Sequence, residues 1–128
     1  MATELATEAR GRRVSLVLGA GGARGLAHMG VIEVLESRGY QIVGIAGSSM
    51  GALVGGIHAA GRLSLYRDWA CALERGDVLR LLDVSWGFPG LIRGDKLMLA
   101  LRELVGDHRI EALGIPFTAV ATDIRAQR

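Results

Sequence analysis

The chain has 128 residues, half of them apolar, which is enough for one hydrophobic core and for at most one domain. Fifteen basic residues against thirteen acidic ones give a formal net charge of +2. A net charge this close to zero does not indicate nucleic-acid binding. The single cysteine, Cys71, excludes an internal disulfide.

Residues 1–13 are predicted to be a polar tail. Their first eight residues contain no apolar segment of the kind found in signal peptides, so a cytoplasmic protein is the default expectation. Arg10, Arg12 and Arg13 cluster just before the first apolar run. We interpret them as solvated residues that guard a hydrophobic strand, and the alternative is peripheral contact with a membrane surface. Fourteen arginines against one lysine, with many Ala and Gly, fit a GC-rich bacterial genome.

A short buried strand is predicted at residues 14–18, followed directly by a glycine-rich loop at residues 19–25. A helix is predicted from Leu26, because apolar residues recur at helical spacing until Gly39, a residue type typical of helix ends. A strand, a glycine loop and a helix in this order favour anion binding, since backbone N–H groups and the helix N-terminus present positive charge. The anion could be a dinucleotide pyrophosphate or the oxyanion of an acyl-transfer intermediate.

The dinucleotide alternative fits the sequence less well. Its fingerprint is Gly-x-Gly-x-x-Gly, followed about 20 residues later by an acidic residue at the end of the second strand. Here the spacing of Gly19, Gly21 and Gly25 is off by one residue, and the next predicted strand ends without Asp or Glu. A dinucleotide-binding domain is therefore the less favoured interpretation, and we expect no cofactor and no metal.

Residues 47–51 read Gly-Ser-Ser-Met-Gly, a Gly-x-Ser-x-Gly motif. An uncharged apolar run at residues 42–46 predicts a strand before it, and a Gly/Ala-rich run at residues 52–57 predicts a helix after it. In this context the motif indicates a nucleophile elbow, a sharp turn that exposes the hydroxyl of Ser49. The bare motif is weak, because composition alone gives roughly 0.13 chance matches. The residues assigned to the turn itself are Gly47, Ser48 and Gly51.

The rest of the chain is predicted more coarsely. Helices are expected at residues 63–75 and 95–105, and a third strand at residues 116–121. Residues 81–92 are rich in turn residues, and we interpret them as a loop packed on the core; the alternative is a mobile apolar flap over the site. Together these elements predict an α/β fold in which helices cover a mainly parallel central sheet.

Two of these motifs, in this order and at this separation, resemble the patatin-like phospholipase family, most of all its bacterial branch similar to neuropathy target esterase. The resemblance is carried by residues 21–30 (Gly-Gly-Ala-Arg-Gly-Leu-Ala-His-Met-Gly) and by residues 47–51, and it extends over residues 14–123. Ala20 departs from the pattern of the many members that have a further glycine there. The resemblance implies a three-layer sandwich, with residues 14–128 forming the N-terminal part of the catalytic domain.

Members of this family hydrolyse acyl esters of phospholipids and related lipids with a Ser–Asp dyad. The resemblance implies that Ser49 is the nucleophile of a serine lipid acyl hydrolase that forms an acyl-enzyme. It also implies a lipid or acyl-ester substrate, and it leaves the oligomeric state open. The residues that it implies for the oxyanion hole are Gly21, Gly22, Ala23, Arg24 and Met50.

The general base of the dyad is missing from the sequence. In the family it is the Asp of an Asp-Gly-Gly or Asp-Gly-Ala motif, and no Asp of this chain precedes a Gly. We therefore expect an N-terminal part of a longer enzyme that is inactive alone. The alternative is a catalytically inactive binding or regulatory module of the same fold. His28, His58 and His108 are interpreted as structural or solvated residues.

Overall fold

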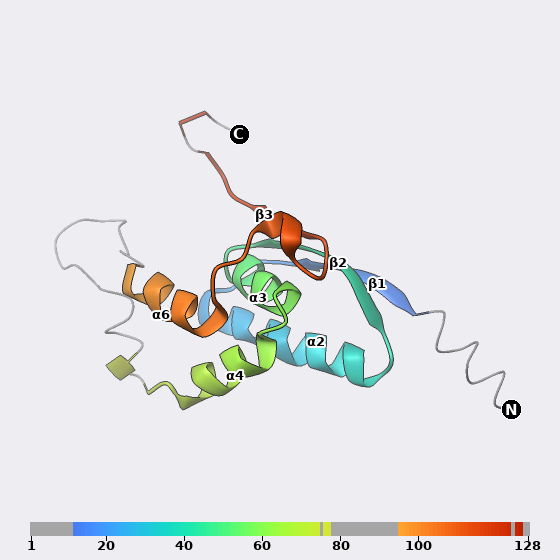
Figure 1. The fold of residues 1–128 in the computed structure, drawn as a ribbon, viewed down its shortest axis with the longest axis horizontal. Helices are drawn as coiled ribbons and strands as arrows, with labels where there is room; N and C mark the ends of the chain where they lie inside the picture. Colours follow the sequence, from blue (N-terminus) through green and yellow to red (C-terminus); the bar gives the residue numbers. More distant parts are fainter. Residues whose placement is uncertain (1–11, 75, 78–94, 124, 127–128) are drawn as a thin grey trace, which may run out of the picture.

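The computed structural model describes residues 12–74, 76–77, 95–123 and 125–126, which form a mixed α/β fold (Figure 1). Residues 81–92, predicted to be a loop packed on the core or else a flap, lie outside the described residues, as does most of the predicted tail. Two of the elements, η1 and η2, are short 3-10 helices. In chain order the elements are β1 (Arg13–Leu18), η1 (Gly22–Leu26), α2 (Ala27–Ser37), β2 (Gln41–Ser48), α3 (Met50–Ala59), α4 (Leu63–Ala72), α6 (Asp95–Val105), η2 (Ile110–Ala112) and β3 (Phe117–Val120).

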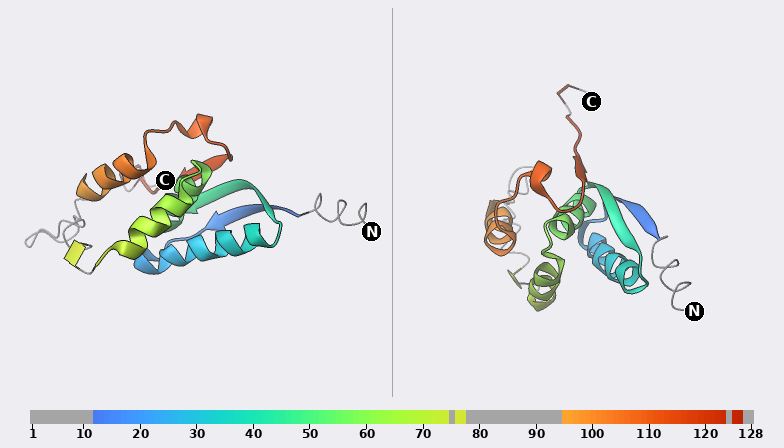
Figure 2. Two further views of the ribbon diagram at one scale, coloured as in Figure 1. Left: turned by 60° about the horizontal axis from the view of Figure 1, so that its bottom comes forward. Right: turned by 45° about the vertical axis from the view of Figure 1, so that its right-hand side comes forward.

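The three strands form one parallel sheet in the order β1-β2-β3. Sequential parallel strands joined by right-handed crossovers place their connecting helices on one face, and Figure 2 shows α2 and α3 together on one side of the strands. Because the strands are parallel, their carboxyl ends meet at one edge of the sheet. This is the edge at which open α/β sheets bind their ligands.

The core lies between the sheet and these two helices. Ile32 of α2 and Val54 of α3 are fully buried, and Leu18 and Ile45 meet them from the strands. The opposite face of the sheet is open over the described residues, where Val17 is 85% exposed and Val120 58% exposed. Parallel sheets are normally covered on both faces. The described residues thus supply two of the three layers expected for the family, and they confirm the predicted α/β class with its parallel sheet.

The remaining helices extend the helical layer. Tyr66 of α4 is buried and stacks on Trp69 with 5.8 Å between ring centroids, and burial raises the pKa of the Tyr66 hydroxyl. Arg67 of α4 reaches Glu33 of α2 at 2.6 Å. Both side chains are well exposed, so this pair adds little stability. No helix in the described part of the chain is both long and apolar enough to cross a bilayer.

Most element boundaries agree with the sequence prediction, and the differences concentrate around the two predicted loops. β2 runs two residues further than expected, to Ser48, and α3 begins at Met50, immediately after Ser49. Residues 22–26, of which 22–25 were expected to be loop, form η1, because tertiary contacts of the glycines override their low helix propensity. The helix predicted at residues 63–75 ends earlier, at Ala72, since Leu73 has extended backbone angles.

Candidate functional site

The predicted elbow is a sharp turn at Ser49, between the last residue of β2 and the first residue of α3. Ser49 has φ 52° and ψ −126°, and it is the one non-glycine with positive φ among the described residues. Such a backbone costs about 1–3 kcal/mol and persists only where the surrounding structure imposes it. Ser49 is exposed, and its side chain makes no capping hydrogen bond to α3. Its hydroxyl is therefore held out at the sheet edge and is not used by the helix.

Steric contacts explain both glycines of the motif. A Cβ atom on Gly47 would lie 2.5 Å from the carbonyl oxygen of Gly51 and 2.6 Å from the nitrogen of Ala52, which is inside the elbow itself. A Cβ atom on Gly51 would overlap the carbonyl oxygen of Leu18 and lie 2.5 Å from that of Gly19. Gly47 thus lets the turn close on itself, and Gly51 lets α3 start directly against the end of β1.

The glycine loop after β1 ends in a helix N-terminus. Gly22 has φ +52°, and the N–H of Arg24 donates to the carbonyl oxygen of Gly21 at 3.1 Å, which closes the first turn of η1. The N–H groups of Gly22 and Ala23 stand at the start of this turn, where a helix offers them no acceptor of its own. The backbone N–H of Arg24 is used within the turn, so any contact of Arg24 with an anion would come from its exposed side chain.

The two predicted loops pack against each other. Gly25 is buried, and a Cβ atom on it would lie 2.5 Å from Cγ and 2.6 Å from Cβ of Met50, the residue after Ser49. Leu18 pairs with Gly47 across the sheet, so the two turns start side by side. The structure therefore brings two helix N-termini, those of η1 and α3, to the same place beside the Ser49 turn. Both would favour negative charge there.

One further side chain belongs to this cluster, that of His28, which the sequence placed next to the glycine loop without naming its partner. Nε2 of His28, in the first turn of α2, lies 2.9 Å from the carbonyl oxygen of Gly19. The ring also lies beside Gly25, where a Cβ atom would be 3.8 Å from Cδ2 of His28. The sequence signal for this contact is a histidine in the first turn of the helix that follows a glycine loop. Helical geometry points such a side chain back towards that loop.

The comparison with protein families decides the class of this chain. The model of the patatin-like phospholipase family matches residues 16–128. The chain belongs to the patatin-like phospholipase family. This membership confirms the resemblance carried by the two loops.

The relatives place the chain within the family. It is 59% identical to an uncharacterised NTE family protein of Mycobacterium tuberculosis over 114 residues, which are 89% of this chain and 32% of that protein. It is 33% identical to neuropathy target esterase of Drosophila persimilis over 129 aligned positions, covering 97% of this chain and 9% of that protein. The chain therefore spans about a third of the length of the mycobacterial relatives it matches.

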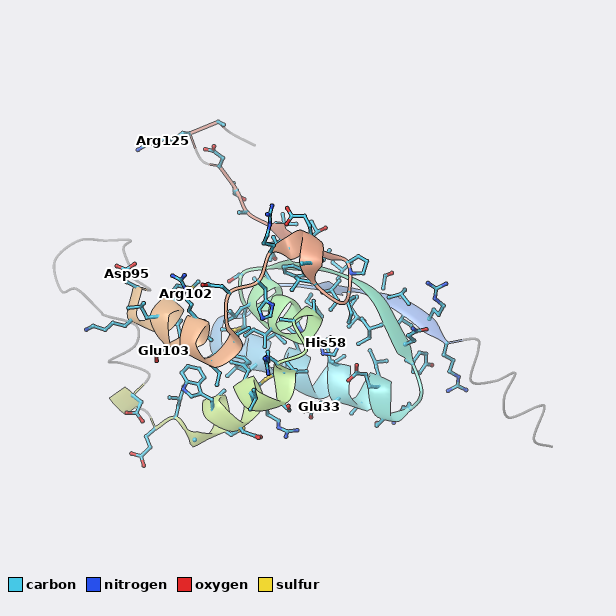
Figure 3. The ribbon with its side chains drawn as sticks, viewed as in Figure 1. Glu33, His58, Asp95, Arg102, Glu103 and Arg125 are labelled. Carbon is cyan, nitrogen blue, oxygen red and sulfur yellow. The ribbon has the colours of Figure 1, made fainter. Side chains whose placement is uncertain are left out.

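Within this patatin-like phospholipase chain, the other two histidines lie apart from the elbow. His58 is nine residues after Ser49 on α3, about 14 Å along the helix axis. His58 is labelled in Figure 3, and its side chain is 10% exposed. Its Nε2 lies 3.3 Å from a carboxylate oxygen of Glu36 without the alignment of a hydrogen bond. His108 bonds the carbonyl oxygen of Val105 at 2.9 Å, beyond the C-terminus of α6. Both contacts agree with the predicted structural roles.

Several aspartates in the described part of the chain contact groups other than Ser49. Asp107, just after α6, pairs with Arg102 at 2.6 Å, and Arg102 is labelled on that helix in Figure 3. Asp123, just after β3, accepts hydrogen bonds of 2.9 Å from the N–H groups of Arg125 and Ala126, so it shapes its own turn. A shallow hollow along α6 is lined by residues that include none of the predicted site residues; these are Asp95, Met98, Leu99 and Arg102. No group of three metal-binding side chains occurs among the described residues.

Proposed function

We propose that the full-length protein is a serine lipid acyl hydrolase in which Ser49 attacks the ester carbonyl and carries the acyl group. The observation that carries this proposal is the positive φ of Ser49 directly before a helix, with the N-terminus of η1 packed beside it. A strained serine at a sheet edge is the arrangement of a nucleophile elbow. Family membership and the relatives named neuropathy target esterase support an acyl ester of a lipid as the substrate.

The reaction is proposed to run in two halves. In the first, Ser49 Oγ adds to the ester carbonyl while a general base takes the hydroxyl proton, and the oxyanion of the tetrahedral intermediate accepts hydrogen bonds from backbone N–H groups. Collapse expels the alcohol, which receives the proton and leaves an acyl-serine. In the second, water adds to the acyl-serine and releases the fatty acid. The N–H groups proposed as donors are those of Gly21, Gly22, Ala23 and Met50, with Arg24 adding the charge of its side chain.

The base is proposed to be an aspartate outside residues 1–128. No Asp in this chain precedes a Gly, as the family motif requires, and Asp123 is engaged in its own turn. The matched region makes up only 32% of a mycobacterial relative, which leaves ample sequence for such a residue. We accordingly propose that residues 1–128 alone do not turn over lipid esters. We further propose a cytoplasmic protein that meets its substrate by peripheral contact with a membrane surface.

The nucleophile is tested by serine substitutions in the full-length protein. Ser49→Ala should reduce hydrolysis of a p-nitrophenyl acyl ester and of a lysophospholipid to background, because no other hydroxyl occupies the turn. Ser48→Ala should retain substantial turnover, since Ser48 belongs to strand β2. A fluorophosphonate probe should label the wild type and Ser48→Ala and should leave Ser49→Ala unlabelled.

The outcomes separate this proposal from its alternative. Full turnover by Ser49→Ala would remove Ser49 as the nucleophile. Wild-type protein that neither hydrolyses esters nor reacts with the probe would instead support a catalytically inactive module of the same fold.

A further inference from the structure

We propose that His28 is a positioning residue of the acyl-transfer site, which fixes the glycine loop by donating a hydrogen bond from Nε2 to the carbonyl oxygen of Gly19. The distance is 2.9 Å. A carbonyl oxygen can only accept, so Nε2 carries the proton. The bond joins the first turn of α2 to the first residue after β1, nine positions earlier in the chain. This inference rests on the proposed function, because it assigns His28 to the loop that would bind the oxyanion.

The loop needs such an anchor because of its composition. Gly19, Ala20, Gly21 and Gly22 offer no side chain beyond one methyl group, and Gly22 sits at φ +52°. Glycines lose the most conformational freedom when they are fixed in one backbone conformation. A Cβ atom on Gly19 or Gly22 would meet no atom within 4 Å, so nothing packs on the side-chain position of these two residues. Their orientation must come from hydrogen bonds and from contacts further along the chain.

The carbonyl that His28 bonds is held from a second side. The start of α3 lies against it, since a Cβ atom on Gly51 would come within 2.5 Å of the Gly19 oxygen. The peptide group after Gly19 is therefore fixed between α2, through the imidazole, and α3, through the elbow. Gly19 is the point at which the strand, the loop and both helices meet.

The consequence concerns the donors of the oxyanion hole. Backbone N–H groups stabilise a developing oxyanion only when they are already oriented towards it before the reaction. Residues 22 and 23 follow Gly19 by three and four positions, so a rotation of the Gly19 peptide would disturb the orientation of the N–H groups that we propose as donors to the oxyanion. His28 touches neither Ser49 nor the substrate in this scheme. It acts through the loop, and its loss should reduce transition-state stabilisation rather than substrate binding.

The experiment compares substitutions that keep or remove the donor in the full-length protein. His28→Gln places an N–H group at about the reach of Nε2, whereas His28→Asn is one methylene shorter and His28→Leu has no donor. We expect His28→Leu and His28→Asn to lower kcat about 10- to 100-fold with KM within about two-fold, since small displacements of catalytic groups have effects of this size. His28→Gln should restore most of the loss.

His108→Leu is the matched control. His108 makes the same kind of bond, from Nε2 to a backbone carbonyl at 2.9 Å, in the turn after α6. It should lower Tm about as much as His28→Leu does and leave kcat unchanged. If His28→Leu does not fold, the pair of Gln and Asn variants carries the test, because both are polar and differ by a single methylene.

The outcomes are distinguishable from those of the proposed function. Turnover by the wild type that disappears in Ser49→Ala establishes the hydrolase independently of His28. With that shown, wild-type kcat in His28→Leu, an equal loss in His28→Gln and His28→Asn, or a loss confined to KM would each overturn the role of His28. Absence of Ser49-dependent turnover in the wild type would overturn the proposed function, and the role of His28 with it.

Discussion

The elbow after β2 and the glycine loop after β1 stand at the same edge of the sheet and pack against each other, yet they are held in different ways. The elbow has a tight local contact, since a Cβ atom on Gly47 would collide with Gly51 and Ala52 only a few positions later, and Gly51 also packs against the end of β1. The loop has open space around Gly19 and Gly22, and besides the bond from the N–H of Arg24 to Gly21 its contacts come from two helices, through His28 of α2 and through Met50 of α3.

The difference teaches how sequence encodes two parts of one site. A turn with a tight contact between residues of its own motif can be recognised in five consecutive residues. A loop that is fixed from outside has a looser local pattern, because its geometry depends on partners elsewhere in the chain. Substitutions of three glycines test this contrast. A Cβ atom on Gly51 would collide with backbone atoms, and one on Gly22 would have open space but a strained φ. A Cβ atom on Gly30 would meet neither obstacle.

The largest effect is expected at the elbow. Gly51→Ala would push a methyl group into the carbonyl oxygens of Leu18 and Gly19, which are backbone atoms and cannot rotate away. We expect the free energy of unfolding of the full-length protein to fall by about 3 kcal/mol, the upper end for overpacking. Esterase turnover should fall to background, because α3 must move away from β1. Urea unfolding and a p-nitrophenyl ester assay measure both. Wild-type stability in this variant would mean that the elbow is held less tightly than the loop.

A smaller effect is expected in the glycine loop. A Cβ atom at Gly22 meets no atom within 4 Å, so the main cost comes from its φ of +52°. Left-handed backbone costs an ordinary residue about 1–2 kcal/mol, and Asn tolerates it better than Val does. Gly22→Val should therefore lower kcat about ten-fold with little change in KM, and Gly22→Asn should lower it less. Steady-state kinetics of the two variants give the comparison. A change confined to KM would indicate that the loop binds a ground-state ligand, such as a nucleotide, instead of an oxyanion.

The sequence predicted the order and type of the main elements because their apolar periods are clear. The helix at residues 95–105 agrees with α6 in both bounds, and Gly39 ends α2 with φ +79°. The predicted boundaries of the elements were wrong where tertiary contacts impose the position of a turn. Gly47 and Ser48 read as turn residues, yet they continue β2, because parallel pairing with Leu18 and Val120 holds them in the sheet.

The candidate site shows the same division. Ser49 could be singled out because its turn is encoded locally, and the structure adds the strained backbone that the motif predicts. The sequence placed His28 next to the glycine loop, but its partner, the carbonyl oxygen of Gly19, depends on how α2 crosses the end of β1. The roles of the oxyanion residues and of the dyad remain proposals. The general base is proposed to be an aspartate outside residues 1–128. The local pattern around Ser49 does not identify it, because the two residues of the dyad would be distant along the chain.

The smallest effect is expected at Gly30, which is the control for the other two glycines. It lies inside α2, is exposed, and has neither a positive φ nor any atom within 4 Å of a Cβ position. Alanine is favoured over glycine in a helix interior by about 0.5–1 kcal/mol, so Gly30→Ala should raise the free energy of unfolding by that amount and leave kcat unchanged. Urea unfolding of the full-length protein and the same ester assay measure both quantities. Destabilisation would show that other atoms of the full-length protein cover this side of α2. Gly30→Ala would then also measure the packing of those atoms and could not serve as the control. The contrast between elbow and loop would have to rest on the Gly51 and Gly22 variants alone.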